Sequence, residues 1–266
     1  MTFTHGYAAN GDLRMYYEVH GRAVDDKPPL LLIPGGGSTI QTNFAGLIPL
    51  VAAQRQVIAV DEEGHGRTAA TDRPLTAENS AGDILAVLDQ LQLDSVDVLG
   101  FSAGGHTALA LAMQHPARVR RLIAASTFFS REAVPDEFWE GMKTATLDNM
   151  PAVYQGADRK INPEPGHLER LFELDRQRII GFPGWSEPDL ARITAPTLVV
   201  AADQDVMSPG HAVRMSRAIP EARLLIVPGG HGDYLGELAA SDGDLQALLR
   251  TLPFILRFLD AQPSEA

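Results

Sequence analysis

The sequence of 266 residues contains no cysteine. This absence excludes a cysteine nucleophile, a thiolate zinc site and a redox-active dithiol. No apolar stretch reaches the length of about 18 residues that would predict a membrane-spanning helix. Basic runs are also missing: none is longer than Arg120-Arg121, and the net charge is −12. Because binding to a polyphosphate backbone relies on clustered Lys and Arg, we expect no nucleic-acid or membrane partner.

The start of the chain, Met1 to Gly6, lacks the basic segment and the apolar segment of a secretion signal. We therefore expect a cytoplasmic protein whose partner is a small-molecule substrate. The sequence leaves open whether the protein is a monomer or a homodimer. Without cysteine, its chemistry must come from serine, histidine and carboxylate side chains.

The composition is that of a packed globule, with 45% hydrophobic residues, 24 glycines and 18 prolines. Chains of about 250 residues with an α/β pattern commonly form one large domain. Short apolar runs alternate with helical patterns, which is typical of a mainly parallel sheet covered by helices. The predicted strands are residues 13–20, 30–33, 56–60, 96–99, 119–125, 197–202 and 223–227.

Helices are predicted at residues 76–91, 104–114 and 244–260, and Pro253 should kink or split the last one. Residues 127–189 interrupt the alternation with helical patches, several prolines and most of the large aromatic residues. We interpret this segment as a helical cap inserted into a core formed by residues 1–126 and 190–266.

The segment Gly100-Phe101-Ser102-Ala103-Gly104 spells G-x-S-x-G between a predicted strand and a predicted helix. A sharp strand-to-helix turn exposes a nucleophilic serine and brings the residues two before and two after it so close that they must be glycine. The helix start would also direct backbone N–H groups at the space beside Ser102. We therefore predict that Ser102 is a nucleophile.

A serine hydroxyl needs a base, and the base needs a third group that fixes its tautomer. His231 follows the strand at 223–227, and Asp203 and Asp205 follow the strand at 197–202. Both loops lie beyond the carboxyl ends of strands, where ligands bind in α/β sheets. We predict Asp205 as the acid, because Asp203 directly follows the strand and is better placed to brace the loop. His65 and Asp61, in a glycine-rich turn, are interpreted as structural.

Acyl transfer also requires hydrogen-bond donors for an oxyanion. One predicted donor is the N–H of Ala103, the residue after the nucleophile. The second is the N–H of Gly36, in the turn Pro34-Gly35-Gly36-Gly37 that follows the strand at 30–33. That turn has no basic residue and no G-K-[ST] ending, so it does not match a phosphate-binding loop.

These motifs together resemble the α/β-hydrolase superfamily over nearly the whole chain, especially its esterases and cofactor-free haloperoxidases. The matching segments are LLIPGGGS, DEEGHGRT, GFSAGG, PTLVVAADQD and PGGHGDYL. The resemblance implies an α/β fold with an eight-stranded, mostly parallel sheet, a cap after the sixth strand, a Ser102-Asp205-His231 triad and no cofactor or metal. One departure is that Pro34 stands where relatives usually carry a histidine that braces the oxyanion turn.

The most economical activity is hydrolysis of a carboxylic ester of a small to medium apolar molecule. Lactone opening, C–C bond hydrolysis and peracid formation use the same triad, and an acyltransferase, a lyase or a non-catalytic ligand-binding protein remains an alternative. Aromatic and apolar cap residues favour an apolar pocket. The candidates for substrate contact are Phe128, Trp139, Met142, Tyr154 and Phe182.

Overall fold

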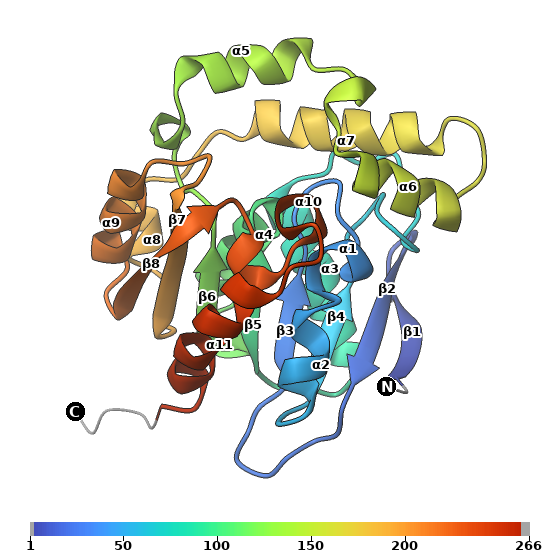
Figure 1. Cartoon of the computed structure of the whole chain (residues 1–266). Helices are drawn as coiled ribbons and strands as arrows, with labels where there is room; N and C mark the ends of the chain where they lie inside the picture. Colours follow the sequence, from blue (N-terminus) through green and yellow to red (C-terminus); the bar gives the residue numbers. More distant parts are fainter. Residues whose placement is uncertain (1–2, 262–266) are drawn as a thin grey trace.

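The computed structural model describes residues 3–261 and contains one eight-stranded sheet with the order β1-β2-β4-β3-β5-β6-β7-β8 (Figure 1). β1 pairs antiparallel with β2, β2 pairs antiparallel with β4, and all later pairs are parallel. The predicted α/β fold is therefore confirmed. The strands are β1 (Phe3–Asn10), β2 (Leu13–His20), β3 (Leu30–Ile33), β4 (Val57–Val60), β5 (Val96–Phe101), β6 (Val119–Ala125), β7 (Thr197–Gln204) and β8 (Ala222–Gly230).

The apolar pattern predicted every strand except β1. Seven of the eight residues of β1 are exposed or only half-buried, so the strand shows no alternation of buried and exposed apolar positions. Its pairing with β2 along the whole length of both strands forms the edge of the sheet. The central strands β3, β4, β5, β6 and β7 are visible in the sequence because their buried residues form continuous runs. β8 is visible from its apolar residues 224–227 although only one of its residues is buried.

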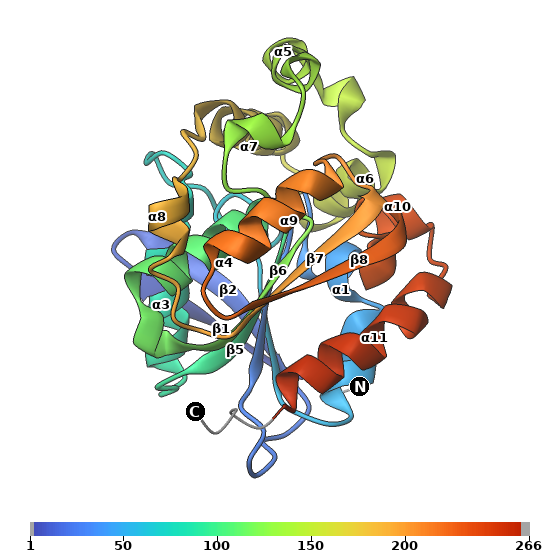
Figure 2. The ribbon, with the colours of Figure 1, turned by 90° about the vertical axis from the view of Figure 1, so that its left-hand side faces the viewer.

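Helices cover both faces of the sheet (Figure 2). One face carries α3 (Ala77–Gln90), α4 (Ala103–Gln114) and α9 (Pro209–Ala218), whose apolar residues form one core cluster with alternate strand residues such as Leu31 and Ile33. The other face carries α1 (Ile40–Phe44), α2 (Leu47–Ala52) and α11 (Gln246–Leu259), packed on the intervening residues such as Leu30 and Leu32. The core therefore has two layers, as the period of two in a strand requires.

Between β6 and β7 the chain leaves the sheet and forms the cap helices α5 (Asp136–Thr144), α6 (Ala152–Ile161) and α7 (His167–Gly181). These three helices cross the top of the molecule in Figure 1. α8 (Glu187–Leu190) then packs against α4 and α9. The remaining short helices are α10 (Leu238–Ser241) and the 3-10 turns η1 (Pro116–Arg118), η2 (Arg131–Ala133), η3 (Leu147–Asn149) and η4 (Asp233–Leu235).

The predicted split of the last helix at Pro253 is wrong, because α11 continues from Gln246 to Leu259. Pro253 lies on the solvent side of the helix, between the buried Leu252 and the exposed Phe254. Water can therefore satisfy the carbonyl group that loses its helical N–H partner, while Leu252 and Ile255 keep the helix packed on the sheet. Across residues 3–261 we find no helix with both the length and the apolarity needed to cross a membrane.

Candidate active site

Ser102 occupies the sharp turn between β5 and α4, with a backbone φ of 53° and ψ of −118°. A φ in this range is costly for any residue other than glycine and marks a strained turn. A Cβ atom on Gly100 would lie 2.3 Å from the carbonyl oxygen of Gly104, and one on Gly104 would lie 2.2 Å from that of Pro34. The glycines predicted from the motif are therefore required by close backbone approach.

The structure brings Ser102, His231 and Asp205 together from three loops at the carboxyl ends of β5, β8 and β7. His231 Nε2 lies 3.0 Å from Ser102 Oγ. His231 Nδ1 lies 2.6 Å from Asp205 Oδ1. This is the geometry in which an imidazole accepts the serine proton while a carboxylate fixes its tautomer.

Asp205 has no exposed side-chain surface, whereas the imidazole of His231 is 29% exposed. Burial by itself would raise the pKa of Asp205. Hydrogen bonds from His231, from the Ser126 hydroxyl and from the Ala202 N–H outweigh burial and hold this pKa below its usual range. The carboxylate therefore stays ionised beside the imidazole at neutral pH.

Asp203 has a different role from Asp205. Its Oδ1 accepts a hydrogen bond of 2.8 Å from the N–H of Gly229, two residues before His231. The expectation that Asp203 braces the loop is thus confirmed. Asp61 is also structural, since its two carboxylate oxygens accept hydrogen bonds from the N–H groups of Ile40 and Arg67.

The N–H groups of Gly36 and Ala103 have no acceptor among residues 3–261, and both residues line the same cavity as Ser102 and His231. The turn that carries Gly36 packs on Ser102, because a Cβ on Gly35 would lie 3.3 Å from the Cβ of Ser102. Two free N–H groups beside a serine match the donor arrangement of an oxyanion hole. Their role as oxyanion donors stays a prediction.

With Pro34 in place of a histidine, other side chains hold this turn. The amide oxygen of Asn43 accepts a hydrogen bond of 2.7 Å from Gly35 N–H. The carboxylate of Asp175, on cap helix α7, accepts one from Gly37 N–H. His65 Nε2 lies 2.9 Å from Asp175 Oδ2 and 3.1 Å from Gly37 N. The brace therefore comes partly from the core and partly from the cap.

Sequence reasoning missed Asp175 and treated His65 as a turn residue. Burial alone would lower the pKa of His65, but the carboxylates of Asp175 and Glu62 raise it to about 9. Burial would raise the pKa of Asp175, and His65 reverses this effect and lowers it. The two side chains therefore form a buried ion pair at neutral pH. The motif Gly64-His65-Gly66 was the only sequence signal for this pair, and nothing in it identifies a partner 110 residues away.

The cavity above Ser102 has a volume of about 290 Å³ and a mostly apolar lining. Among the residues predicted to contact substrate, Phe128, Met142 and Tyr154 line it. The Tyr154 hydroxyl donates a hydrogen bond of 2.7 Å to Glu237, which links the cap to the loop after His231. Further large apolar residues of the lining are Phe138, Met150, Phe172, Ile179 and Val206.

Trp139 and Phe182, also predicted to contact substrate, do not line this cavity. Trp139 is buried against Phe128 and Phe138, and its indole N–H donates to the carbonyl oxygen of Arg131. Phe182 stacks on His106 at a ring distance of 4.1 Å. Both aromatic rings therefore bury apolar surface between the cap and the core: Trp139 packs against Phe128, and Phe182 packs on His106.

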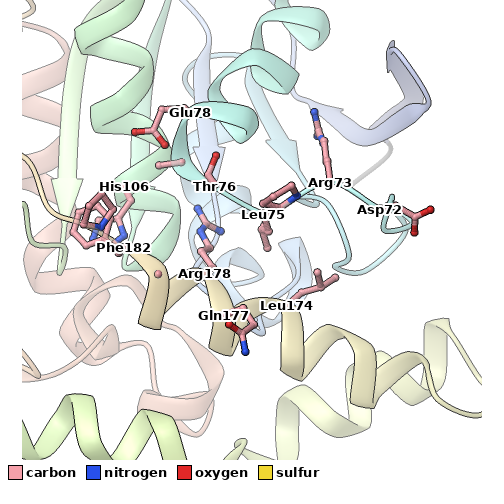
Figure 3. Close-up of a pocket in the computed structure, with 14 residues that line it drawn as sticks. Asp72, Arg73, Leu75, Thr76, Glu78, His106, Leu174, Gln177, Arg178 and Phe182 are labelled. Atoms are coloured by element: carbon pink, nitrogen blue, oxygen red, sulfur yellow. The ribbon is translucent and has the colours of Figure 1, made fainter.

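His106 and Phe182 lie side by side at one end of a second cavity of about 530 Å³, while Arg178 projects from α7 near its middle (Figure 3). His106 also lines the cavity above Ser102, so its ring is part of the wall between the two spaces. Burial, together with the positive charge of Arg178, lowers the pKa of His106 to about 3. Arg178 itself is paired with Glu62 at 3.0 Å.

Comparisons with known proteins agree with this arrangement. The profile of the family described as alpha/beta hydrolase fold matches residues 28–160. A 2-hydroxy-6-oxo-2,4-heptadienoate hydrolase from Pseudomonas putida is 30% identical over 223 residues, which cover 74% of this chain and 79% of that protein. A pimeloyl-[acyl-carrier protein] methyl ester esterase from Neisseria meningitidis is 33% identical over 171 residues, covering 64% of this chain and 63% of that protein.

Among solved structures, a meta-cleavage product hydrolase from Pseudomonas fluorescens superposes with a TM-score of 0.78 at 20% identity, covering 97% of both chains. At this identity the likeness shows a shared fold and nothing more. Family profile, sequence relatives and fold agree, and the chain belongs to the alpha/beta hydrolase fold family.

Proposed function

We propose that this protein is a serine hydrolase that cleaves a carboxylic ester of a small to medium apolar molecule through an acyl-enzyme on Ser102. The observation that carries the proposal is the unbroken contact from Asp205 through His231 to Ser102, beside two backbone N–H groups that have no acceptor within residues 3–261. The apolar lining of the cavity favours a hydrocarbon acyl or alkyl group. The esterase relative from Neisseria meningitidis supports ester chemistry.

In the proposed reaction, Ser102 Oγ attacks the carbonyl carbon while His231 Nε2 takes the hydroxyl proton. The N–H groups of Gly36 and Ala103 hold the oxyanion, and Asp205 stabilises the imidazolium. His231 then returns the proton to the departing alkoxide, and the alcohol leaves. A water molecule attacks the acyl-enzyme in the same way, so that the acid is released and Ser102 regains its proton.

A fluorophosphonate probe tests the nucleophile without knowledge of the natural substrate. The wild-type protein should gain one covalent adduct at Ser102. Ser102→Ala should abolish labelling and lower the kcat for p-nitrophenyl butyrate by about 10⁴-fold or more. Ser216→Ala is the matched control, because that hydroxyl donates to the carbonyl oxygen of Val213 on the same helix α9. Ester turnover that persists in Ser102→Ala would refute the proposal.

C–C bond hydrolysis is the second candidate, and the relative from Pseudomonas putida favours it. A heptadienoate carries a carboxylate, whereas the carboxylate of Asp175 lines the cavity here beside the oxyanion turn. That carboxylate is paired with His65, however, and Arg176 also lines the cavity, so the charges of the lining do not disfavour an anionic substrate. Comparing kcat/KM for a neutral p-nitrophenyl ester, a lactone and a 2-hydroxy-6-oxo-dienoate separates the candidates.

A further inference from the structure

The oxyanion turn is held from two sides. From the core, Asn43 accepts a hydrogen bond from Gly35 N–H, and Gly35 in turn accepts one of 3.1 Å from Ser38 N–H. From the cap, Asp175 accepts a hydrogen bond from Gly37 N–H. The N–H of Gly36 lies between these two anchors. Its direction therefore depends on a contact with a helix that belongs to the cap.

The contact is close and mostly buried. The Asp175 side chain is 15% exposed and that of His65 is 2% exposed. A Cβ atom on Gly36 would lie 3.3 Å from Asp175 Oδ1, so the carboxylate packs directly against the residue that carries the free N–H. A single oxygen, Asp175 Oδ2, meets both Gly37 N–H and His65 Nε2.

We propose that Asp175 and His65 are positioning residues that couple the cap to the oxyanion hole, so that Gly36 N–H reaches catalytic geometry only while α7 is seated on the turn. This inference rests on the serine hydrolase function proposed above. The turn lacks the histidine that braces it in relatives. In this protein the charged pair of His65 in the core and Asp175 in the cap holds the turn instead.

The protonation state of His65 determines whether the pair holds. Nδ1 of His65 lies 2.9 Å from the carbonyl oxygen of Glu63 and so carries a proton. Nε2 then donates to Asp175 only when the ring is an imidazolium. The other ionisable groups that face the pair are Glu62 from the same loop, Arg178 from α7 and Tyr154 from α6.

Deprotonation of His65 turns the lone pair of Nε2 toward the carboxylate of Asp175. The attraction between the two side chains is then lost, and Gly37 N–H is free to donate to His65 instead. Because the pKa of His65 is raised to about 9, the brace is present at neutral pH and weakens as the pH rises through that value. The kcat of the enzyme should therefore fall on the alkaline side with a midpoint near pH 9.

The test uses Asp175→Asn, which keeps the size and one acceptor oxygen but removes the charge. Displacing a catalytic group by about 1 Å costs up to about 10²-fold in rate. We expect kcat for p-nitrophenyl butyrate and the rate of labelling by a fluorophosphonate to fall by about 10-fold to 100-fold, with little change in KM. The alkaline limb near pH 9 should disappear, because burial without Asp175 lowers the pKa of His65.

Glu169→Gln is the matched control, since Glu169 is an exposed acid on the same helix. It should leave kcat and the pH profile unchanged. A purely structural role for Asp175 would lower the melting temperature without altering the pH profile. If Asp175→Asn does not fold, the pH dependence of kcat in the wild-type protein still tests the proposal. A wild-type kcat that stays constant up to about pH 10.5 overturns it.

The outcomes also separate this inference from the proposed function. A wild-type protein that reacts with the fluorophosphonate, together with an Asp175→Asn variant of equal kcat and unchanged pH profile, overturns the coupling alone. A wild-type protein that neither labels nor turns over esters overturns the hydrolase function and the coupling with it.

Discussion

A single methyl group added at Gly104 should separate the nucleophile from the oxyanion turn. The added Cβ would lie 2.2 Å from the carbonyl oxygen of Pro34 and 2.6 Å from that of Ile33. Both obstacles are backbone atoms, which cannot rotate away as a side chain can. Relief requires the turn that carries Gly36 to move from Ser102 by on the order of 1 Å. Overpacking of this kind costs about 1–3 kcal/mol of stability, and such a displacement costs about 10²-fold in rate.

The assay is kcat/KM for p-nitrophenyl butyrate together with thermal unfolding of Gly104→Ala. We expect kcat/KM to fall by about 10²-fold and the melting temperature to fall by about 2–10 °C. Gly156→Ala is the matched control, because a Cβ there meets nothing within 4 Å in the exposed middle of α6. In that helix the same substitution should stabilise by about 0.5–1 kcal/mol. If Gly104→Ala kept wild-type activity, the close packing of the two turns would not matter for catalysis.

Further predictions concern the acid, the pocket and the pH dependence of stability. Asp205→Asn should lower kcat by about 10⁴-fold without unfolding the protein, as single-turnover kinetics and circular dichroism can show. Met142→Ala should enlarge the cavity and raise the ratio of kcat/KM for p-nitrophenyl decanoate over acetate by about 10-fold. Phe182→Ala should leave that ratio unchanged but lower the unfolding free energy by about 3–5 kcal/mol. Because folding raises the pKa of His65 to about 9, stability from this pair is complete below about pH 6.5 and is lost as the pH rises through 9. Urea titrations should show a loss of about 3 kcal/mol over this range, and Asp175→Asn should show a much smaller one.

The sequence was sufficient for the fold class and for the triad because both depend on local patterns. Continuous apolar runs identify strands that are buried on both faces. Ser102 and Asp205 each stand just beyond such a strand, and His231 follows the apolar run of β8. Strands of a parallel sheet end at a common edge, so three separate local signals imply one site. The geometry agrees, with His231 within hydrogen-bonding distance of both partners.

The cap could not be predicted in the same detail. Its amphipathic helices bury only one face each, and an apolar residue such as Phe138 or Trp139 fits equally well against the core or in a pocket. Of these neighbours, Phe138 lines the cavity above Ser102, whereas Trp139 packs against Phe128 and donates to the carbonyl oxygen of Arg131. That difference depends on the angle at which α5 docks, which local periodicity does not encode.

By itself, the sequence determined that this chain forms an α/β sheet and that Ser102 sits in a strand-to-helix turn, because strand periodicity and glycine spacing are local properties of the backbone. Only the tertiary structure decided that the cap supplies Asp175 to the oxyanion turn and that His65 becomes its charged partner. The physical reason is that the pairing of two distant ionisable side chains depends on how α7 lies on the sheet, and this position follows from the packing of the whole molecule.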